Sequence, residues 1–290
     1  MAQTEKNKTE DGVLYLVATP IGNLSDISER AKKVLSEVSF VAAEDTRNTA
    51  KLLSCYGIRA ELVSYHEHNR RESGERIVAR LLGGESCALV TDAGMPAISD
   101  PGEDLVRDCA DAGITVRIIP GACAAVSALA LSGLGTSRFA FEGFLPPKAG
   151  ERRARLEAVA SDDRTLIFYE APHKLKATLT DMAEIFGKER KISLCRELTK
   201  LNEEVTRTTL GAATEYYAEH EPRGEYVLII DGGDGNKRGS DKSALLTLTP
   251  AMHVQHYEAE GMPKMAAIKA AAKDRGMSKS ELYNILLEDN

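Results

Sequence analysis

Two carboxylates and a guanidinium stand together just after a short apolar run in the first half of the chain. Glu44, Asp45 and Arg47 follow the run 39–43, which has the length and composition of a buried strand. A carboxylate beside an arginine suits general acid–base chemistry, because each side chain can stabilise a charge on the other or on a substrate. Asp45 is equally well explained as the N-cap of the next helix, whereas capping does not account for Glu44 and Arg47.

A second polar group follows the next apolar run, in the sequence YHEHNRRE (65–72). Imidazole, amide and guanidinium groups at one strand end suit a polar or phosphate-bearing substrate. Two histidines two residues apart also fit a metal, but no third ligand follows at a suitable spacing, so no metal is expected. The residues assigned to substrate binding here are His66, His68, Asn69 and Arg70.

Three further loops that follow apolar runs are rich in glycine, proline and alanine. They read ATPIGNL (18–24), TDAGMPAISDPG (91–102) and IIPGACAA (118–125). Such loops let a backbone approach a ligand closely, and the carboxyl ends of parallel strands are where α/β proteins bind ligands. The first loop has one glycine in place of G-x-G-x-x-G, and no Walker A pattern occurs. An ordinary strand-to-helix turn is the plain alternative for the first loop.

Strands and helices alternate along the segment that carries these loops. The pattern predicts a parallel sheet covered by helices on both faces, in a domain of residues 12–137. Its first helix is expected within 25–38, with Ser25 or Asp26 as the N-cap. From Arg138 the strands come closer together, which predicts a second α/β domain over 138–232 that includes a hairpin.

The two ends of the chain are of a different kind. Residues 1–11 are polar and predict a disordered lead-in, and 233–245 have the composition of a linker. Residues 246–290 predict three short helices separated by turns. No signal peptide is recognisable and no apolar run approaches about 18 residues, so we expect a cytoplasmic protein without a membrane span.

Charge and cysteine content narrow the class of protein. The formal net charge of −7 argues against non-specific binding to duplex nucleic acid, although local basic patches still allow contact with a large folded RNA. The five cysteines are odd in number and none has metal-ligand spacing. We expect reduced thiols that pack as small apolar side chains.

These segments together resemble the class III S-adenosylmethionine-dependent methyltransferases, the fold of the tetrapyrrole methylases and diphthine synthase. Within that family they look like the subgroup that methylates the ribose 2′-oxygen of cytidine-1402 in 16S rRNA. The resemblance implies two α/β domains that form a cleft, followed by a small helix-turn-helix-like module. It covers residues 13–230 in blocks that read ATPIGNLSDIS, EDTR, YHEHN, TDAGMPAISDPG, IPGACA, FEGFLPPK, FYEAPHK and RELTK.

The resemblance implies that S-adenosylmethionine lies folded in the cleft. Tetrapyrrole methylases usually carry G-D-P in the central loop, where this chain has Gly94, Met95 and Pro96. The acidic contact is therefore either lost or supplied by Asp92 or Asp100. The residues that the resemblance assigns to the cofactor are Pro20, Ile21, Gly22, Gly94, Met95, Ile98, Ser99, Pro120, Gly121, Ala122 and Ala124.

Methyl transfer to a ribose hydroxyl needs alignment and a group that favours the alkoxide, because the hydroxyl is a weak nucleophile near neutral pH. The sequence does not rank the residues that supply that group. Glu170 and His173 also fit the start of the helix that follows them. The bases considered are Glu44, Asp45, Asp100 and Glu170, and the polarising groups are Arg47, His173 and Lys200.

The resemblance also implies 16S rRNA within the 30S subunit as the partner, and a homodimer. Basic clusters usually form solvated surfaces, and only the resemblance suggests that those of this chain contact RNA. The C-terminal module is expected to make an accessory contact with the RNA. The basic residues assigned in this way are Lys148, Arg152, Arg153 and Arg196. The alternatives are a methyltransferase for a tetrapyrrole or another small molecule, and a non-catalytic nucleotide- or RNA-binding adaptor.

Overall fold

The computed structural model describes residues 9–233, 245–259 and 261–288. The chain divides into two compact units, Met1–Leu156 with Arg164–Asp231, and Glu157–Asp163 with Gly232–Asn290. The first unit holds two five-stranded sheets, and the second holds the C-terminal helices. Residues 1–8 of the predicted lead-in and 234–244 of the predicted linker lie outside the described residues.

The first sheet is parallel throughout, as the sequence predicts, with the strand order β3-β2-β4-β1-β5. All five strands therefore end at the same edge, which brings the loops that follow them together. The strands are β1 (Val13–Val17), β2 (Phe40–Ala43), β3 (Leu62–Ser64), β4 (Cys87–Val90) and β5 (Thr115–Ile119).

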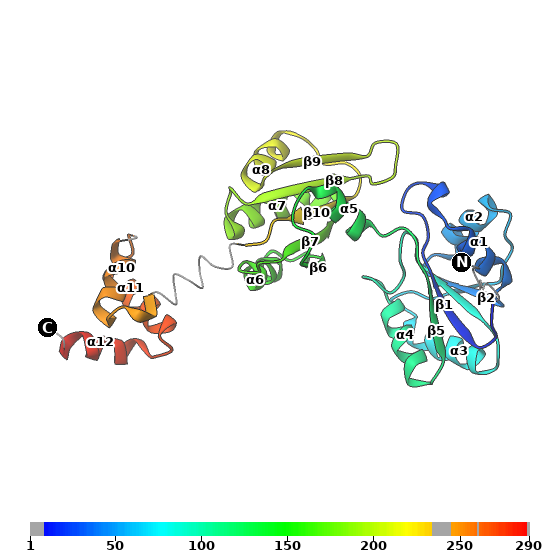
Figure 1. The fold of residues 1–290 in the computed structure, drawn as a ribbon, viewed down its shortest axis with the longest axis horizontal. Coiled ribbons are helices and arrows are strands. Elements are labelled where there is room, and N and C mark those ends of the chain that lie inside the picture. Colours follow the sequence, from blue (N-terminus) through cyan, green and yellow to red (C-terminus); the bar gives the residue numbers. More distant parts are fainter. Residues whose placement is uncertain (1–8, 234–244, 260, 289–290) are drawn as a thin grey trace, which may run out of the picture. The chain divides into compact units, whose positions relative to one another are not determined.

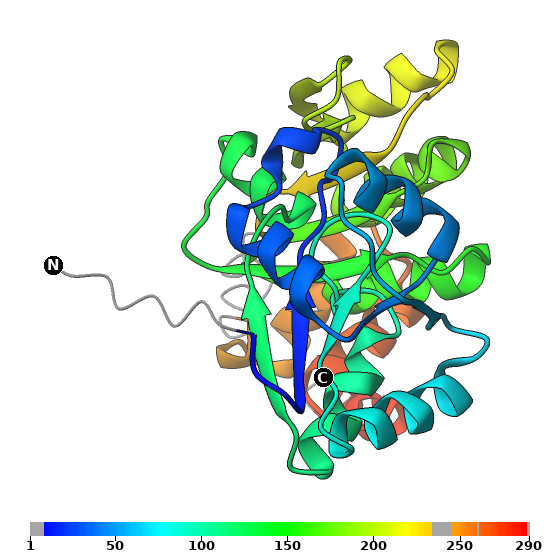
Figure 2. The ribbon, with the colours of Figure 1, turned by 90° about the vertical axis from the view of Figure 1, so that its right-hand side faces the viewer.

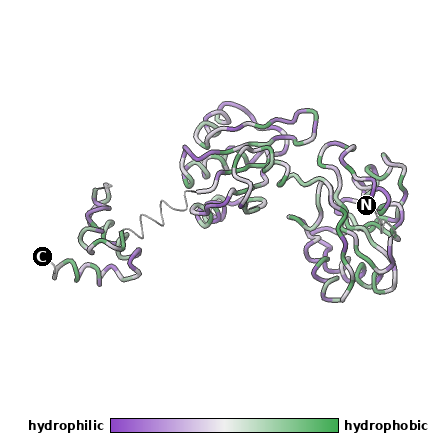
Figure 3. The backbone as a smooth tube through the Cα atoms, viewed as in Figure 1, coloured by the Kyte–Doolittle hydropathy of each residue, from purple (hydrophilic) through white to green (hydrophobic). Residues whose placement is uncertain are grey.

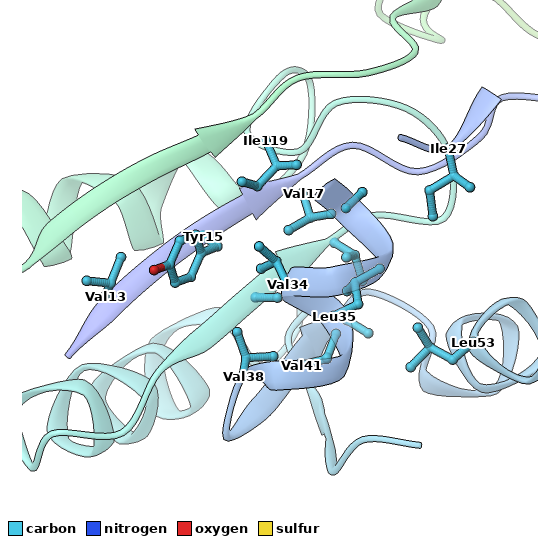
Figure 4. Close-up of a cluster of buried hydrophobic side chains, with 14 residues drawn as sticks. Val13, Tyr15, Val17, Ile27, Val34, Leu35, Val38, Val41, Leu53 and Ile119 are labelled. Carbon is cyan, nitrogen blue, oxygen red and sulfur yellow. The ribbon is translucent and has the colours of Figure 1, made fainter. Parts of the chain in front are cut away.

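Helices cover both faces of this sheet (Figures 1 and 2). Alternate residues of β1 point to opposite sides: Val13, Tyr15 and Val17 pack with α1 and α2, as Figure 4 shows. Leu14 and Leu16 pack with α3 and α4. The four helices are α1 (Glu29–Glu37), α2 (Thr46–Cys55), α3 (Arg70–Leu82) and α4 (Gly102–Asp111).

The first helix begins later than the sequence analysis expects. Residues Leu24–Asp26 form a separate 3-10 turn capped by Asn23, and α1 starts at Glu29. Its N-cap is Ser28, whose Oγ accepts a hydrogen bond from Ala31 N at 3.1 Å. The prediction of Ser25 or Asp26 is wrong because Ile27 is buried in extended backbone, and this separates the two helical segments.

The second sheet is mixed and has the order β6-β7-β10-β8-β9. Strands β6 and β7 are parallel, and the other neighbours are antiparallel, including the β8–β9 hairpin that the sequence predicts. Its strands are β6 (Phe139–Phe144), β7 (Thr165–Glu170), β8 (Lys191–Arg196), β9 (Glu204–Thr209) and β10 (Tyr226–Ile230). The helices between them are α6 (Ala149–Val159), α7 (Pro172–Phe186) and α8 (Leu210–Glu219).

Helix α5 (Ala124–Ser132) packs on the second sheet, although the sequence analysis assigns it to the first domain. Ala125, Ala128 and Leu129 are buried against Ile167 and Ile229. An apolar residue in the sequence predicts that its side chain is buried, but it does not predict which sheet the side chain packs against. The change from one sheet to the other therefore falls after β5, before the predicted boundary at residue 138.

The second unit contains the three helices that the sequence predicts, α10 (Pro250–Ala259), α11 (Lys264–Asp274) and α12 (Lys279–Glu288). They share a small core in which Val254, Ile268 and Leu282 are buried. Figure 3 shows hydrophobic residues on parts of these helices as well as along the strands of the first unit. None of the helices among the described residues is long and apolar enough to cross a membrane.

The five cysteines carry no disulfide, and three of them are buried apolar packing residues. Burial raises the pKa of the Cys109 thiol to about 11, which keeps it protonated. Cys123 is half-buried and packs at the edge of an apolar cluster, whereas Cys55 is exposed, so the expectation that the thiols pack as small apolar side chains does not hold for Cys55.

The packing of α5 predicts the effect of shortening one of its side chains. Leu129→Ala should lower the free energy of unfolding by about 2–5 kcal/mol, because it leaves a cavity between α5 and the second sheet. Urea unfolding followed by circular dichroism measures the change. Leu82→Ala is the control, because that leucine is 64% exposed. Equal losses in the two variants would contradict the assigned packing.

Candidate functional site

A cavity of about 500 Å³ takes its walls from both sheets of the first unit. The first sheet contributes the loops after β1, β2 and β4, and the start of α5, which follows β5, adds Cys123 and Ala124. The second sheet contributes residues at the ends of β6, β7 and β8 and the start of β10. The volume lies within the ~300–1,000 Å³ of typical small-molecule sites.

The loops after β1 and β4 are joined backbone to backbone. Thr19 N donates to Gly94 O at 2.9 Å, and Gly94 N donates to Thr19 O at 3.1 Å. Gly94 has a φ of +86°, and a Cβ added there would lie 3.2 Å from Ile21 Cγ2. Glycine is needed at this position for its backbone conformation and for the close approach of Ile21.

Six of the eleven residues that the sequence analysis assigns to the cofactor line this cavity. The other five are not part of the lining, and two of them, Gly22 and Gly121, lie close to neighbouring segments. A Cβ on Gly22 would lie 2.4 Å from Lys200 Cγ, and one on Gly121 would lie 2.9 Å from Ala18 Cβ. The lining residues are Ile21, Gly94, Met95, Ile98, Ser99 and Ala124, and the remaining ones are Pro20, Gly22, Pro120, Gly121 and Ala122.

The loop after β4 owes its shape to Asp100. Asp100 Oδ1 accepts hydrogen bonds from Ala97 N at 3.0 Å and Gly102 N at 2.8 Å, and Oδ2 accepts one from Ile98 N at 3.1 Å. These bonds hold Ala97 and Ser99 at φ values of +67° and +65°. Left-handed backbone at a non-glycine residue costs roughly 1–2 kcal/mol, so the loop is strained and held in place.

The two aspartates that could replace the carboxylate absent at Met95 both accept hydrogen bonds. Both oxygens of Asp100 are occupied by backbone N–H groups. Asp92 Oδ2 accepts a hydrogen bond from Asn48 Nδ2 at 3.1 Å, which ties the loop to α2. Met95 itself lines the cavity.

Aromatic residues from the second sheet form part of the wall, and the sequence analysis missed them. Tyr169 stacks edge-to-face with Phe141 and Phe144, and its hydroxyl accepts a hydrogen bond from Ala125 N at 3.2 Å. Burial raises the pKa of Tyr169 to about 12, so it remains a neutral phenol. Its place directly before Glu170 at a strand end is the sequence signal that could have identified it.

The hairpin loop after β8 carries a strained ion-pair network. Glu197 and Thr199 have φ values of +52° and +64°. Lys200 Nζ lies 2.9 Å from both Glu197 Oε1 and Glu225 Oε2. Burial lowers the pKa of Lys200, but the hydrogen bonds to these two carboxylates outweigh it and the net shift is upward. Lys200 therefore brings a stable positive charge to the cavity.

Among the carboxylates that line the cavity, Glu44 is the one with a raised pKa. Partial burial raises its pKa above the ordinary value, and the negative charges of Asp92 and Asp100 raise it further. His66 is close enough to act in the opposite direction. A glutamate with a raised pKa is suited to take up a proton.

Asp45 and Arg47 act on each other outside the cavity lining. Asp45 is the N-cap of α2 and accepts hydrogen bonds from Arg47 N and Asn48 N. The Arg47 side chain, 2.9 Å away, and these N–H groups lower the pKa of Asp45 to about 2. The capping interpretation is confirmed for Asp45, and so low a pKa makes it a poor base.

Glu170 lines the cavity, yet its carboxylate is buried and fully engaged. Oε1 accepts a hydrogen bond from Ala171 N at 2.9 Å, and Oε2 accepts one from Thr178 Oγ1 at 2.6 Å. These bonds join β7 to the first turns of α7. His173 is an exposed residue in the first turn of α7 and does not line the cavity.

The polar group after β3 forms a turn at the start of α3. Asn69 Oδ1 accepts a hydrogen bond from His66 N at 2.8 Å, and Asn69 Nδ2 donates to Ser64 O. Nδ1 of His66 is buried without a hydrogen-bond partner, and His68 is exposed. Arg70 pairs with Asp104 at 2.7 Å.

The basic residues assigned to RNA all have carboxylate partners. Lys148 pairs with Glu151 at 3.0 Å, and Arg196 pairs with Glu204 at 3.4 Å. Arg153 lies 2.7 Å from Asp181 and 2.6 Å from Glu184. RNA phosphates would have to compete with these carboxylates.

Arg152 differs from the other basic residues, because it is only 8% exposed. Its guanidinium lies 2.7 Å from Asp181 of α7. The structure thus gives Arg152 a role in joining α6 to α7 rather than a surface for RNA. Among the described residues, no group of three or more His, Cys, Asp or Glu side chains is arranged to hold a metal ion.

Comparison with known proteins identifies the family. The model for tetrapyrrole (corrin/porphyrin) methylases matches residues 13–214. A ribosomal RNA small subunit methyltransferase I from Halalkalibacterium halodurans is 50% identical over 283 residues, covering 98% of this chain and 97% of that protein. The protein of the same name from Bacillus subtilis is 46% identical, covering 96% of this chain and 94% of that protein.

The fold agrees with this assignment. A uroporphyrin-III C-methyltransferase from Thermus thermophilus, solved with S-adenosyl homocysteine, superposes with a TM-score of 0.53 at 18% identity. The match covers 78% of this chain and 99% of that chain. The fold expected from the resemblance is thereby confirmed. The chain belongs to the tetrapyrrole methylase family, in the group of the ribosomal RNA small subunit methyltransferase I proteins.

Proposed function

We propose that this chain transfers the methyl group of S-adenosylmethionine to the ribose 2′-oxygen of cytidine-1402 in 16S rRNA, within the 30S subunit. The observation that carries the proposal is the 50% identity with a ribosomal RNA small subunit methyltransferase I over 98% of the chain. The size of the cavity and the chemistry of its lining residues also support the proposal.

The cavity suits S-adenosylmethionine in size and chemistry. Apolar and aromatic side chains, including Ile21, Ile98 and Tyr169, offer surfaces to the adenosine. The lining also contains the polar side chains of Glu44, Ser99 and Lys200, which can contact the polar groups of a ligand. The residues that would hold the cofactor are Ile21, Gly94, Met95, Ile98, Ser99 and Ala124. When bound, the cofactor supplies an electrophilic methyl group on a sulfonium centre.

Within the cavity, Glu44 is the residue best suited to take the proton from the 2′-hydroxyl. Its pKa is raised by burial and by Asp92 and Asp100, although a backbone hydrogen bond from Asp92 acts in the opposite direction, whereas both carboxylate oxygens of Asp100 and of Glu170 accept hydrogen bonds. Lys200 is the cation that would favour the alkoxide, since its charge is fixed by Glu197 and Glu225. Arg47 and His173 remain outside the lining, so we assign no proton transfer to them.

The RNA would approach over the turn after β3. His66 lies close enough to Glu44 to lower its pKa. The His68 ring lies beside that of His66, with 5.9 Å between the two ring centroids. This side of the cavity offers hydrogen-bonding groups to a ribose or phosphate. A tetrapyrrole acceptor is less favoured, because the uroporphyrin-III enzyme is only 18% identical. The proposed ribosomal RNA substrate supports the further proposal that the protein acts in the cytoplasm.

The chain is further proposed to act as a homodimer. Helix α5 has no charged side chain, although Val126 and Leu131 are 53% and 40% exposed. An uncharged helix with one face on its own sheet and apolar residues on the other is typical of an interface.

The proposed reaction predicts one labelled nucleotide. With labelled S-adenosylmethionine and 30S subunits from cells that lack this methylation, the label should appear on the ribose of cytidine-1402. Nuclease digestion with mass spectrometry locates it, and calorimetry measures cofactor binding independently. Label on a base or at another nucleotide would contradict the assigned target, and absence of cofactor binding would contradict the methyltransferase itself.

The assignment of Glu44 predicts a pH-dependent rate. A raised pKa keeps Glu44 protonated to a higher pH than an ordinary glutamate, so kcat should rise with pH through that raised pKa. Glu44→Gln should lower kcat by about 10²- to 10⁴-fold and abolish this rise. Asp45→Asn is the matched variant, because asparagine also caps α2 and should retain the rise. A Glu44→Gln enzyme with the wild-type pH profile would overturn the assignment.

The proposed interface predicts a change of mass. Sedimentation equilibrium should give the dimer mass for the wild type and the monomer mass for Val126→Glu, because a charge would be buried without a partner. Leu82→Glu, on α3, should remain dimeric. A dimer that survives Val126→Glu would place the contact elsewhere.

A further inference from the structure

Leu201 is 99% exposed, more than any other large apolar side chain among the described residues. It lies at the tip of the hairpin between β8 and β9, next to Lys200, which lines the cavity. An apolar side chain in full contact with water adds nothing to the stability of this fold. Its position at the edge of the site therefore calls for another explanation.

The loop that carries Leu201 is fixed by hydrogen bonds at its base. Thr199 N donates to Glu203 Oε2 at 2.6 Å, and Glu203 N donates to Lys200 O at 3.1 Å. Lys200 N in turn donates to Glu197 O at 3.0 Å. Leu201 thus stands at the tip of a turn whose base is closed by hydrogen bonds.

Packing against the rest of the site fixes the loop further. Gly22, in the loop after β1, leaves room for Lys200 and Thr199, which a Cβ would approach to 2.4 and 2.7 Å. Gly224, with a φ of +79°, leaves room for Glu197, whose Cγ would lie 2.5 Å from an added Cβ. The left-handed residues Glu197 and Thr199 are held in place by these neighbours. A strained loop that is held this firmly is a common property of functional sites.

The acidic residues of the loop are used within it. Glu203 accepts the Thr199 N–H, and Glu197 accepts the Glu225 N–H at 3.0 Å while pairing with Lys200. What the tip offers to a partner is the Leu201 side chain, with the exposed Asn202 after it and the Lys200 cation before it.

We propose that Leu201 is a wedge that enters the RNA beside the target nucleotide and fills the space that this nucleotide leaves when it enters the cavity. The inference rests on the proposed RNA substrate. A ribose inside a folded RNA can reach a cavity only if its nucleotide leaves the stack, and apolar side chains that enter between bases promote this in nucleic-acid-binding proteins.

The test uses the full chain and 30S subunits that lack the methyl group. Leu201→Ala should lower kcat/KM for methyl transfer on the order of ten- to a hundredfold, because the unstacked nucleotide loses the side chain that replaces it. Leu201→Met, which keeps an apolar side chain of similar reach, should restore most of the rate. Leu82→Ala, at a leucine 64% exposed on α3, is the matched control and should behave as the wild type.

Three further measurements separate a wedge from other roles. The Kd for S-adenosylmethionine and the sedimentation mass of Leu201→Ala should equal those of the wild type. In semi-synthetic 30S subunits with an abasic neighbour beside the target, the wild type and Leu201→Ala should differ less, because the stack is already weakened. A residue that only maintains the fold should give the same difference between the two enzymes on both substrates.

The outcomes are distinct. Wild-type turnover by Leu201→Ala overturns the wedge, and so does a loss of cofactor binding or an undiminished difference on the abasic substrate. Dissociation of the Leu201→Ala dimer would assign Leu201 to a protein interface instead. A wild-type enzyme that leaves 30S subunits unmethylated would refute the proposed function, whatever the variant does.

Discussion

The backbone pairing of Thr19 with Gly94 is the interaction on which the site depends. Because β1 and β4 are parallel neighbours, their following loops leave the sheet side by side, and the two hydrogen bonds join them. Ile21 and Met95 are thereby directed into the same cavity. Gly22, in the same loop as Thr19, then meets the hairpin loop that carries Lys200. One short contact thus links elements of both sheets.

The sequence predicted the parallel sheet and the loops at its edge, because strand length, helix caps and glycine positions are local properties. It also named ten residues of the cavity lining, six of them as cofactor contacts and four as catalytic candidates. It did not separate carboxylates that are available from those that are engaged. Asp100 and Glu170 looked like bases, but their partners are N–H groups of their own segments and a threonine eight residues away, which only the folded chain reveals.

The same limit applies to residues whose partners lie far away in the sequence. Arg152 read as part of a basic surface, and Asp181, 29 residues later, buries it. Tyr169 read as an ordinary strand residue, and its contact with Ala125 depends on α5 lying on the second sheet. The apolar composition of a helix predicts that it packs in a core, whereas the topology of the folded chain determines which sheet it packs against.

The position of α5 bears on how such a protein can be divided or recombined. The helix follows the last strand of the first sheet in sequence, yet its buried residues complete a face of the second. A fragment that starts at Arg138 would leave Ile167 and Ile229 facing water, while one that starts near Gly121 would keep them covered. The exchangeable module is therefore the second sheet together with α5, so Cys123 and Ala124, which line the cavity, would be transferred along with the second sheet.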